Sequence, residues 1–233
     1  MSQPQPPPNF KPALIIVDVQ EDFCPPNGTL AVPNGRDIIP PINTLLTLPF
    51  PLKIATQDWH PADHISFASN HANKKPLEDT IEVVNPLDTS ERYDTRLWPV
   101  HCVQGSPGAE FAEGLDVERV GRVVKKGQKS EVEMYSAFYD PLRTRVCDSG
   151  LAGVLKKEGV SHVYVTGLAG DYCVKATAVD AAKEGFVTFV VEEGVRCVDQ
   201  KGWEGVKEEL GGKGVKVVGI EGDEVGWVRG LSV

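Results

Sequence analysis

The chain has 233 residues, of which 41% are hydrophobic and 24% are charged, and its formal net charge is −9. This composition is typical of a folded globular protein and excludes a disordered or fibrous chain, while the length fits one domain of roughly 200–250 residues. An acidic chain repels phosphate backbones, so we expect no nucleic-acid partner. No apolar run approaches the roughly 20 residues of a membrane-spanning helix, so we expect no membrane partner either.

The first twelve residues, MSQPQPPPNFKP, are polar and rich in proline, and we expect residues 1–12 to form a flexible tail. They contain no apolar signal region, which favours a cytoplasmic protein, with the nucleus and the peroxisome as alternatives. The five cysteines are scattered and include no CxxC pair, which indicates reduced thiols. The oligomeric state stays open, and a homo-oligomer is compatible with the sequence.

Short apolar runs alternate with amphipathic stretches along the rest of the chain, and this alternation predicts strands and helices in turn. The predicted strands are residues 13–17, 52–56, 119–124, 160–166, 186–191 and 215–220. The predicted helices are residues 36–46, 149–158, 172–184 and 202–210. The polar stretch from residue 57 to residue 96 is too long for a simple connecting loop, so we expect it to contain functional residues.

Strand runs that are apolar on both faces and separated by helices predict a parallel sheet with helices on each side. The expected fold class is therefore α/β, with three α/β/α layers around a central six-stranded, mostly parallel sheet in a single domain over residues 13–233. Ligands of such sheets bind beyond the carboxyl ends of the strands. Reactive side chains that follow different strands are therefore expected to meet at one edge of the sheet.

Residues suited to catalysis follow four of the predicted strands. They are Asp18 after the first strand, Asp58 and His60 after the second, Lys125 and Lys126 after the third, and Cys173 after the fourth. Each residue alone is weak evidence. Their shared placement is stronger evidence, because four separate strands would have to coincide.

Cys173 lies in the first turn of a predicted helix, where the helix dipole and free backbone N–H groups lower the pKa of a thiol. Most cysteines are small core residues. The GLAGD turn before Cys173, however, offers backbone N–H groups that can bind an oxyanion, so we favour Cys173 as a catalytic nucleophile. An aspartate at the end of a strand, such as Asp18, caps the following turn about as often as it has a catalytic role. Beside a thiol, however, it can act as a general base. A nearby lysine, either Lys125 or Lys126, would stabilise both charged groups.

Asp58 and His60 project to the same side of an extended segment, because side chains two residues apart do so. Three more histidines, His64, His71 and His101, follow in the same part of the chain. This clustering favours a divalent metal over a polar loop with incidental histidines. Carboxylate and imidazole ligands indicate Zn²⁺ first, with Fe²⁺ or Mn²⁺ as alternatives.

Six short motifs together resemble those of the nicotinamidases of the isochorismatase-like cysteine hydrolase superfamily, over most of the chain from residue 13. The motifs are DVQEDF (18–23), DWHP (58–61), HISF (64–67), WPVHCV (98–103), KG (126–127) and GLAGDYCV (167–174). The resemblance implies the isochorismatase-like hydrolase fold. It also implies hydrolysis of nicotinamide to nicotinate and ammonia in NAD salvage. Pyrazinamide has a ring of the same shape, so it should also fit as a substrate.

The resemblance implies a catalytic triad of Asp18, Lys126 and Cys173, because the catalytic lysine of the family is followed directly by glycine. In the implied mechanism Asp18 takes the thiol proton, the sulfur attacks the amide carbon, and water hydrolyses the resulting thioester. A cis peptide is implied between Leu168 and Ala169. The N–H groups of Ala169 and Cys173 would then form the oxyanion hole.

The same resemblance implies that Asp58, His60 and His101 hold a metal, which orients the pyridine ring through its nitrogen. His64 matches a position that binds the metal in some members and not in others. Glu133 matches a position that reaches the metal through water.

Phe23, Trp98 and Tyr135 resemble the residues that hold the ring, and aromatic side chains around a cleft suit a flat substrate. Two features depart from the family pattern. Gly170 stands where many members have threonine, which we expect to loosen the turn. Residues 73–96 form a longer segment than in bacterial members and resemble the eukaryotic form.

Three other readings are compatible with parts of the sequence. The first is another hydrolase of the superfamily, an isochorismatase or an N-carbamoyl amidase, which would not use the Asp-x-His metal site. The second is a non-enzymatic thiol- and metal-binding protein, with Cys173 as a redox-sensitive thiol of low pKa. The third is a nucleotide-binding Rossmann protein, which is disfavoured because no GxGxxG motif follows the first strand.

Overall fold

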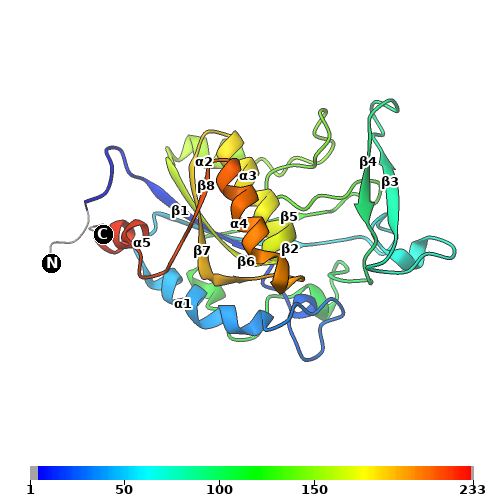
Figure 1. The fold of residues 1–233 in the computed structure, drawn as a ribbon, viewed down its shortest axis with the longest axis horizontal. Helices are drawn as coiled ribbons and strands as arrows, with labels where there is room; N and C mark the ends of the chain where they lie inside the picture. Colours follow the sequence, from blue (N-terminus) through cyan, green and yellow to red (C-terminus); the bar gives the residue numbers. More distant parts are fainter. Residues whose placement is uncertain (1–4, 232–233) are drawn as a thin grey trace.

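The computed structural model describes residues 5–231, and its centre is a six-stranded sheet (Figure 1). The strand order is β5-β2-β1-β6-β7-β8, and all neighbouring strands run parallel. The strands are β1 (Pro12–Val17), β2 (Leu52–Asp58), β5 (Arg122–Lys126), β6 (His162–Leu168), β7 (Val187–Arg196) and β8 (Val215–Val218). The predicted α/β class and the six predicted strands are confirmed.

The central strands are apolar along their length because both of their faces are covered. All six residues of β1 are buried, and so are all seven residues of β6. Successive side chains of β1 enter two separate cores, with Leu14 and Ile16 in one and Ala13, Ile15 and Val17 in the other. This division explains why the sequence shows a continuous apolar run instead of an alternating one.

Helices cover both faces of the sheet, as the three-layer prediction requires (Figure 1). Two helices, α1 (Ile39–Thr47) and α5 (Asp223–Arg229), contribute to one core. Three helices, α2 (Leu151–Lys157), α3 (Lys175–Lys183) and α4 (Trp203–Gly212), contribute to the other. Within residues 5–231, none of these helices has the length and apolar character needed to cross a membrane.

The helix predicted over residues 172–184 begins differently in the structure. A π-helical turn spans Gly170–Val174, and α3 follows it directly. Such turns are frequent at functional sites. A Cβ atom on Gly170 would lie 2.6 Å from the side chains of both Val195 and Cys197, so this turn is closely packed. The packing does not match the looser turn that we expected from glycine at this position.

The ordered domain begins slightly before residue 13. Pro12 is the first residue of β1, and the ring of Phe10 packs edge-on against His162 at 4.8 Å and Trp227 at 5.9 Å. The end of the predicted tail therefore packs on the body of the protein. Residues 1–4 of that tail lie outside the described residues.

The polar stretch from residue 57 to residue 96 contains a β-hairpin that the sequence did not predict. Strands β3 (Thr80–Val84) and β4 (Arg92–Arg96) pair antiparallel and stand apart from the main sheet (Figure 1). Each strand has a single buried residue, Val83 in β3 and Thr95 in β4. The alternation in β3 covers only Ile81 and Val83, and the buried position of β4 is the polar Thr95, so the apolar pattern is too short to identify the hairpin.

Shortening Ile42 is expected to destabilise the fold, because its side chain is fully buried in the core beneath α1. Ile42→Ala should lower the free energy of unfolding by about 2–5 kcal/mol, through lost burial and a residual cavity. The exposed Thr44 on the same helix provides a control, and Thr44→Ala should cost much less. Urea unfolding measures both, and equal losses in the two variants would contradict this packing.

Candidate active site

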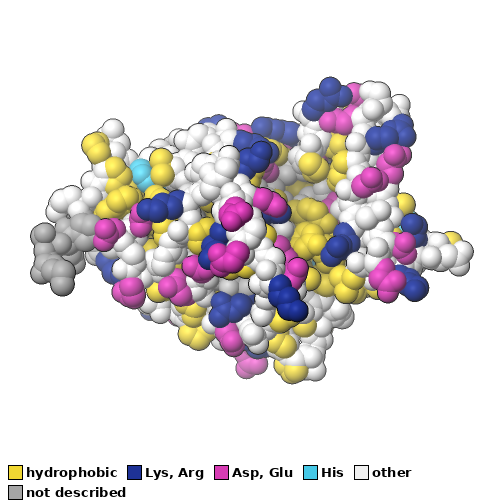
Figure 2. All heavy atoms as spheres, in the orientation of Figure 1, with side chains coloured by type: hydrophobic (Ala, Val, Ile, Leu, Met, Phe, Trp, Pro, Cys, Tyr) yellow, Lys and Arg dark blue, Asp and Glu magenta, His cyan; other side chains and the backbone are white. Residues whose placement is uncertain are grey.

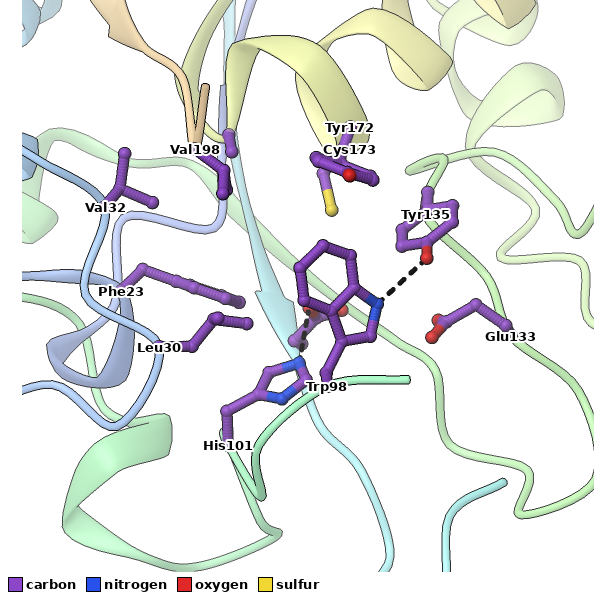
Figure 3. A pocket seen from close by; sticks show the side chains of 12 residues that line it. Phe23, Leu30, Val32, Trp98, His101, Glu133, Tyr135, Tyr172, Cys173 and Val198 are labelled. Atoms are coloured by element: carbon purple, nitrogen blue, oxygen red, sulfur yellow. Dashed lines mark hydrogen bonds and ion pairs between the residues drawn. The ribbon is translucent and has the colours of Figure 1, made fainter. Parts of the chain in front are cut away.

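The four strand-end positions singled out in the sequence meet at the carboxyl edge of the sheet. Asp18 follows β1, Asp58 ends β2, Lys126 ends β5, and Cys173 lies in the π-helical turn after β6. These four strands are consecutive in the order β5-β2-β1-β6, and the direction of chain progress reverses between β1 and β6. Open α/β sheets bind ligands at such a reversal. Figure 3 shows Cys173 directed from this turn into a pocket.

Asp18, Lys126 and Cys173 lie in close contact. The Nζ atom of Lys126 is 2.9 Å from Asp18 Oδ2 and 3.5 Å from Cys173 Sγ. A carboxylate oxygen of Asp18 lies within 4.8 Å of the sulfur. All three side chains are buried. A small movement is therefore enough to pass a proton between sulfur and carboxylate.

Lys126 is a buried cation shared by two acids. Its Nζ atom also lies 2.5 Å from Asp58 Oδ1, so it joins Asp58 to Asp18. Burial lowers the pKa of Lys126, but the two carboxylates outweigh this effect and hold the pKa well above its ordinary value. Lys125 faces the other way and places its ammonium 3.3 Å from the centre of the Trp59 ring. The lysine at the site is therefore Lys126.

Asp18 has the environment of a general base. Burial raises its pKa to about 6, against the lowering effect of Lys126. Its Oδ1 atom accepts a hydrogen bond of 2.5 Å from the hydroxyl of Thr56. The backbone of Asp18 has a φ of +50°, which is uncommon for a residue other than glycine. A carboxylate with a pKa near neutrality is suited to accept and return a proton.

The thiol of Cys173 has a pKa well above its ordinary value, because burial outweighs the lowering effect of Lys126. The low pKa expected from its place at a helix start is therefore wrong for the protein as described. The side chain is buried except where it meets the pocket, and Asp18 and Asp58 beside it further oppose a negative charge. Cys173 is thus a neutral thiol that needs the neighbouring base for activation.

Asp58, His60 and His101 converge beside the triad, with ligand atoms within 4.8 Å of one another. The Nδ1 atom of His60 bonds the carbonyl of Gly127 at 2.8 Å, and Nδ1 of His101 bonds the carbonyl of Pro99 at 2.8 Å. A carbonyl only accepts, so both Nδ1 atoms carry hydrogen. In the neutral rings, which are the form that binds a metal, both Nε2 atoms therefore keep a lone pair for a ligand.

These three residues fit a divalent metal ion. The Nε2 atom of His60 is buried and has no hydrogen-bond partner within the described part of the chain. The Oδ2 atom of Asp58 lies 3.6 Å from His60 Nε2 and 4.0 Å from His101 Nε2. Ligands about 2 Å from a common ion stand roughly 3–4 Å apart. One carboxylate and two imidazoles match the donors that Zn²⁺, Fe²⁺ and Mn²⁺ accept.

His64 lies beside this cluster but directs both ring nitrogens to protein atoms. Its ring centre is 4.0 Å from that of His60. Its Nδ1 atom is 2.8 Å from Ser66 Oγ, and its Nε2 atom is 3.2 Å from the carbonyl of Val132. Burial lowers the pKa of His64 to about 4, so the ring is neutral. His64 thus has no free lone pair for an ion and supports the ring of His60 instead.

The pocket between sulfur and histidines brings together most of the predicted binding residues (Figure 3). Phe23, Trp98, Glu133, Tyr135 and Ala169 line it, together with Asp58, His101, Tyr172 and Cys173. Three further residues that were not predicted also line it, and these are Leu30, Val32 and Val198. These lie in loops and belong to no motif, so nothing in the sequence separates them from ordinary core residues.

The segment from Leu168 to Cys173 borders the pocket. The Leu168–Ala169 peptide is cis, as the resemblance implies. Leu168 itself is fully buried and is not among the residues that line the pocket. Ala169 and Cys173 do line it.

Gln20 is a positioning residue to which the sequence analysis assigned no role. Its Nε2 atom donates to the carbonyl of Asp58 at 2.9 Å, and its Oε1 atom accepts from the N–H of Asp58 at 2.8 Å. The strand β1 ends at Val17, so this buried amide replaces the missing backbone neighbour at the end of β2. The orientation of Asp58 depends on this pair of bonds.

Comparison with known proteins identifies the family. The isochorismatase domain matches residues 12–221, so the chain belongs to the isochorismatase family. A nicotinamidase of Acinetobacter baylyi is 44% identical over 190 residues, which are 82% of this chain and 83% of that protein. The resemblance noted in the sequence is confirmed.

Two solved structures are similar throughout. The yeast nicotinamidase bound to the inhibitor nicotinaldehyde is 35% identical with a TM-score of 0.83, covering 89% of this chain and 99% of its own. The pyrazinamidase of Pyrococcus horikoshii in complex with zinc is 35% identical with a TM-score of 0.69, covering 90% and 99%. The fold expected from the resemblance is thereby confirmed.

Replacing Gly127 should disturb the candidate metal centre. Gly127 has a φ of +65°, and a Cβ atom there would overlap the ring of His60. Gly127→Ala is therefore expected to displace the ring and to lower zinc affinity by at least about tenfold. Gly121→Ala is the matched control, because its Cβ would meet only an ordinary contact at 3.6 Å. Zinc titration of the apo proteins measures the effect, and equal affinities would contradict it.

Two histidine variants distinguish a ligand from a supporting residue. His101→Ala should abolish stoichiometric zinc binding, because it removes one of three convergent donors. His64→Gln should retain one zinc ion per chain and weaken binding by at most about 10–100-fold. Metal analysis after dialysis measures the stoichiometry. Loss of the ion from His64→Gln at saturating zinc would show that His64 is a ligand.

Proposed function

We propose that the protein is a metal-dependent nicotinamidase, which hydrolyses nicotinamide to nicotinate and ammonia as a step of NAD salvage. The observation that carries this proposal is the contact of Cys173, Asp18 and Lys126 next to a convergent Asp-His-His cluster. The relatives support it, because the Acinetobacter baylyi protein is a nicotinamidase and the yeast enzyme binds nicotinaldehyde.

The pocket suits a flat heteroaromatic amide. Phe23, Trp98 and Tyr135 supply aromatic surfaces, while Cys173 and His101 lie on opposite sides of the space (Figure 3). A ring between them would present its amide carbon to the sulfur and its nitrogen to the metal cluster. A divalent ion held by that cluster would supply a Lewis-acidic contact for the ring nitrogen.

The chain's own groups account for the proton transfers. Asp18 accepts the proton of Cys173 as the sulfur attacks the amide carbon, and the N–H groups of Ala169 and Cys173 stabilise the oxyanion. Asp18 then gives its proton to the departing ammonia, which leaves a thioester. Water loses a proton to the same carboxylate, attacks the thioester, and releases nicotinate while the sulfur regains its hydrogen. Lys126 keeps its positive charge throughout and offsets the moving negative charge.

The metal that best suits the site is Zn²⁺, with Fe²⁺ and Mn²⁺ as alternatives that accept the same donors. The zinc complex of the Pyrococcus horikoshii pyrazinamidase supports this choice, and its name also supports pyrazinamide as a second substrate. Glu133 lines the pocket without joining the three ligands. We assign to it a contact with the metal through water.

Two further expectations are retained as proposals. Residues 13–233 form one catalytic domain, which the family match over residues 12–221 supports. The protein acts in the cytoplasm, which is supported by five cysteines that are all free thiols.

Cys173→Ala tests the proposed reaction. The variant should release ammonia from nicotinamide at least about 10⁴-fold more slowly, because it lacks the nucleophile. Cys147→Ala is the control, since Cys147 does not line the pocket. Chelation of the metal should also abolish release by the unmodified protein. Undiminished ammonia release by Cys173→Ala would refute the mechanism.

A further inference from the structure

We propose that the β3–β4 hairpin positions one wall of the substrate pocket through Thr95 and Tyr93. This wall is formed by Trp98 and residues 133–135. The inference rests on the proposed function and explains the long segment that the sequence left without a shape. Both residues lie on β4, two positions apart, and therefore face the same side of the hairpin. Figure 2 shows the hairpin as a lobe beside the body, with hydrophobic side chains in the hollow between them.

Thr95 anchors the two aromatic residues of the wall. The indole Nε1 of Trp98 donates to the hydroxyl of Tyr135 at 2.9 Å (Figure 3), and the same hydroxyl is 3.0 Å from Thr95 Oγ1. An indole N–H only donates, so the phenol accepts from Trp98 and has its own hydrogen for Thr95. Thr95 is buried, so water does not replace it. One chain of hydrogen bonds thus runs from the hairpin through both rings.

Tyr93 holds the backbone of the same wall two residues earlier. Its hydroxyl donates to the carbonyl of Glu133 at 3.0 Å and accepts from the N–H of Glu133 at 3.2 Å. Its ring packs on a small apolar cluster that includes Met134. The carbonyl of Met134 in turn lies 3.3 Å from Lys126 Nζ. Residues 133–135 are therefore held between the hairpin on one side and the catalytic lysine on the other.

The far end of the hairpin is also fixed to the body. Asn85, after β3, donates to Thr144 Oγ1 at 3.0 Å. Glu91, before β4, accepts from the backbone N–H and the Nε of Arg143 at 3.0 and 3.2 Å. The outward-facing Asp94 is exposed and is not among the residues that line the pocket. Because the hairpin is anchored both at its tip and at its inner face, it can hold Trp98 and residues 133–135 in fixed positions.

The test compares the steady-state kinetics of four variants with those of the unmodified protein. Thr95→Val keeps the shape but removes the hydroxyl, and it should raise KM for nicotinamide roughly tenfold while kcat changes much less. Tyr93→Phe should act in the same direction. Thr95→Ser restores the hydroxyl and should restore KM, and Asp94→Asn on the opposite face should change neither parameter. Urea unfolding confirms that each variant is folded.

A second readout does not depend on turnover. The indole N–H signal of Trp98 in a ¹⁵N-correlated NMR spectrum, assigned with Trp98→Phe, should shift in Thr95→Val but not in Thr95→Ser or Asp94→Asn. Unchanged KM and an unchanged indole signal in Thr95→Val would overturn the proposal, and so would equal effects of valine and serine. If the unmodified protein does not hydrolyse nicotinamide, the proposed function fails, and the indole signal alone decides whether the hairpin positions the wall.

Discussion

The site depends on one buried ammonium group. Two carboxylates as close as those of Asp18 and Asp58 would not both stay ionised in a dry interior unless a cation lay between them. The Nζ atom of Lys126 fills this place at 2.9 and 2.5 Å from them. It thereby couples the half of the site that carries the sulfur to the half that is suited to a metal. Burial of such a group is costly, and the two ion pairs offset that cost.

The parallel sheet supplies the positions, and short-range contacts then refine them. Adjacent strand ends bring residues 18, 58, 126 and 168 to one edge although they are far apart in sequence. Gln20 fixes the backbone of Asp58, and the carbonyls of Gly127 and Pro99 fix the tautomers of His60 and His101. The strands thus bring the chemistry together, and side-chain-to-backbone bonds orient it.

The parts of the fold and of the site that could be predicted are those whose stabilising interactions leave a pattern in the sequence. Burial on both faces leaves continuous apolar runs, so β1, β6 and the residues after them were predicted. The β3–β4 hairpin has one buried residue per strand, and the apolar alternation of β3 is too short to predict it. The raised pKa of Cys173 was missed because burial, which outweighs the helix start, is a property of the packed protein. The hydrogen bonds that occupy both ring nitrogens of His64 are likewise not shown by spacing.

The protonated state of the sulfur has a consequence for chemical durability. Peroxides and alkylating agents react with thiolates, and a thiol that keeps its proton is a poor target for them. Because burial raises the pKa of the Cys173 thiol and the side chain is almost wholly buried, we expect the protein without substrate to resist oxidative inactivation. The arrangement favours a dedicated catalyst over a redox sensor, since a sensor needs a sulfur that is reactive without a substrate.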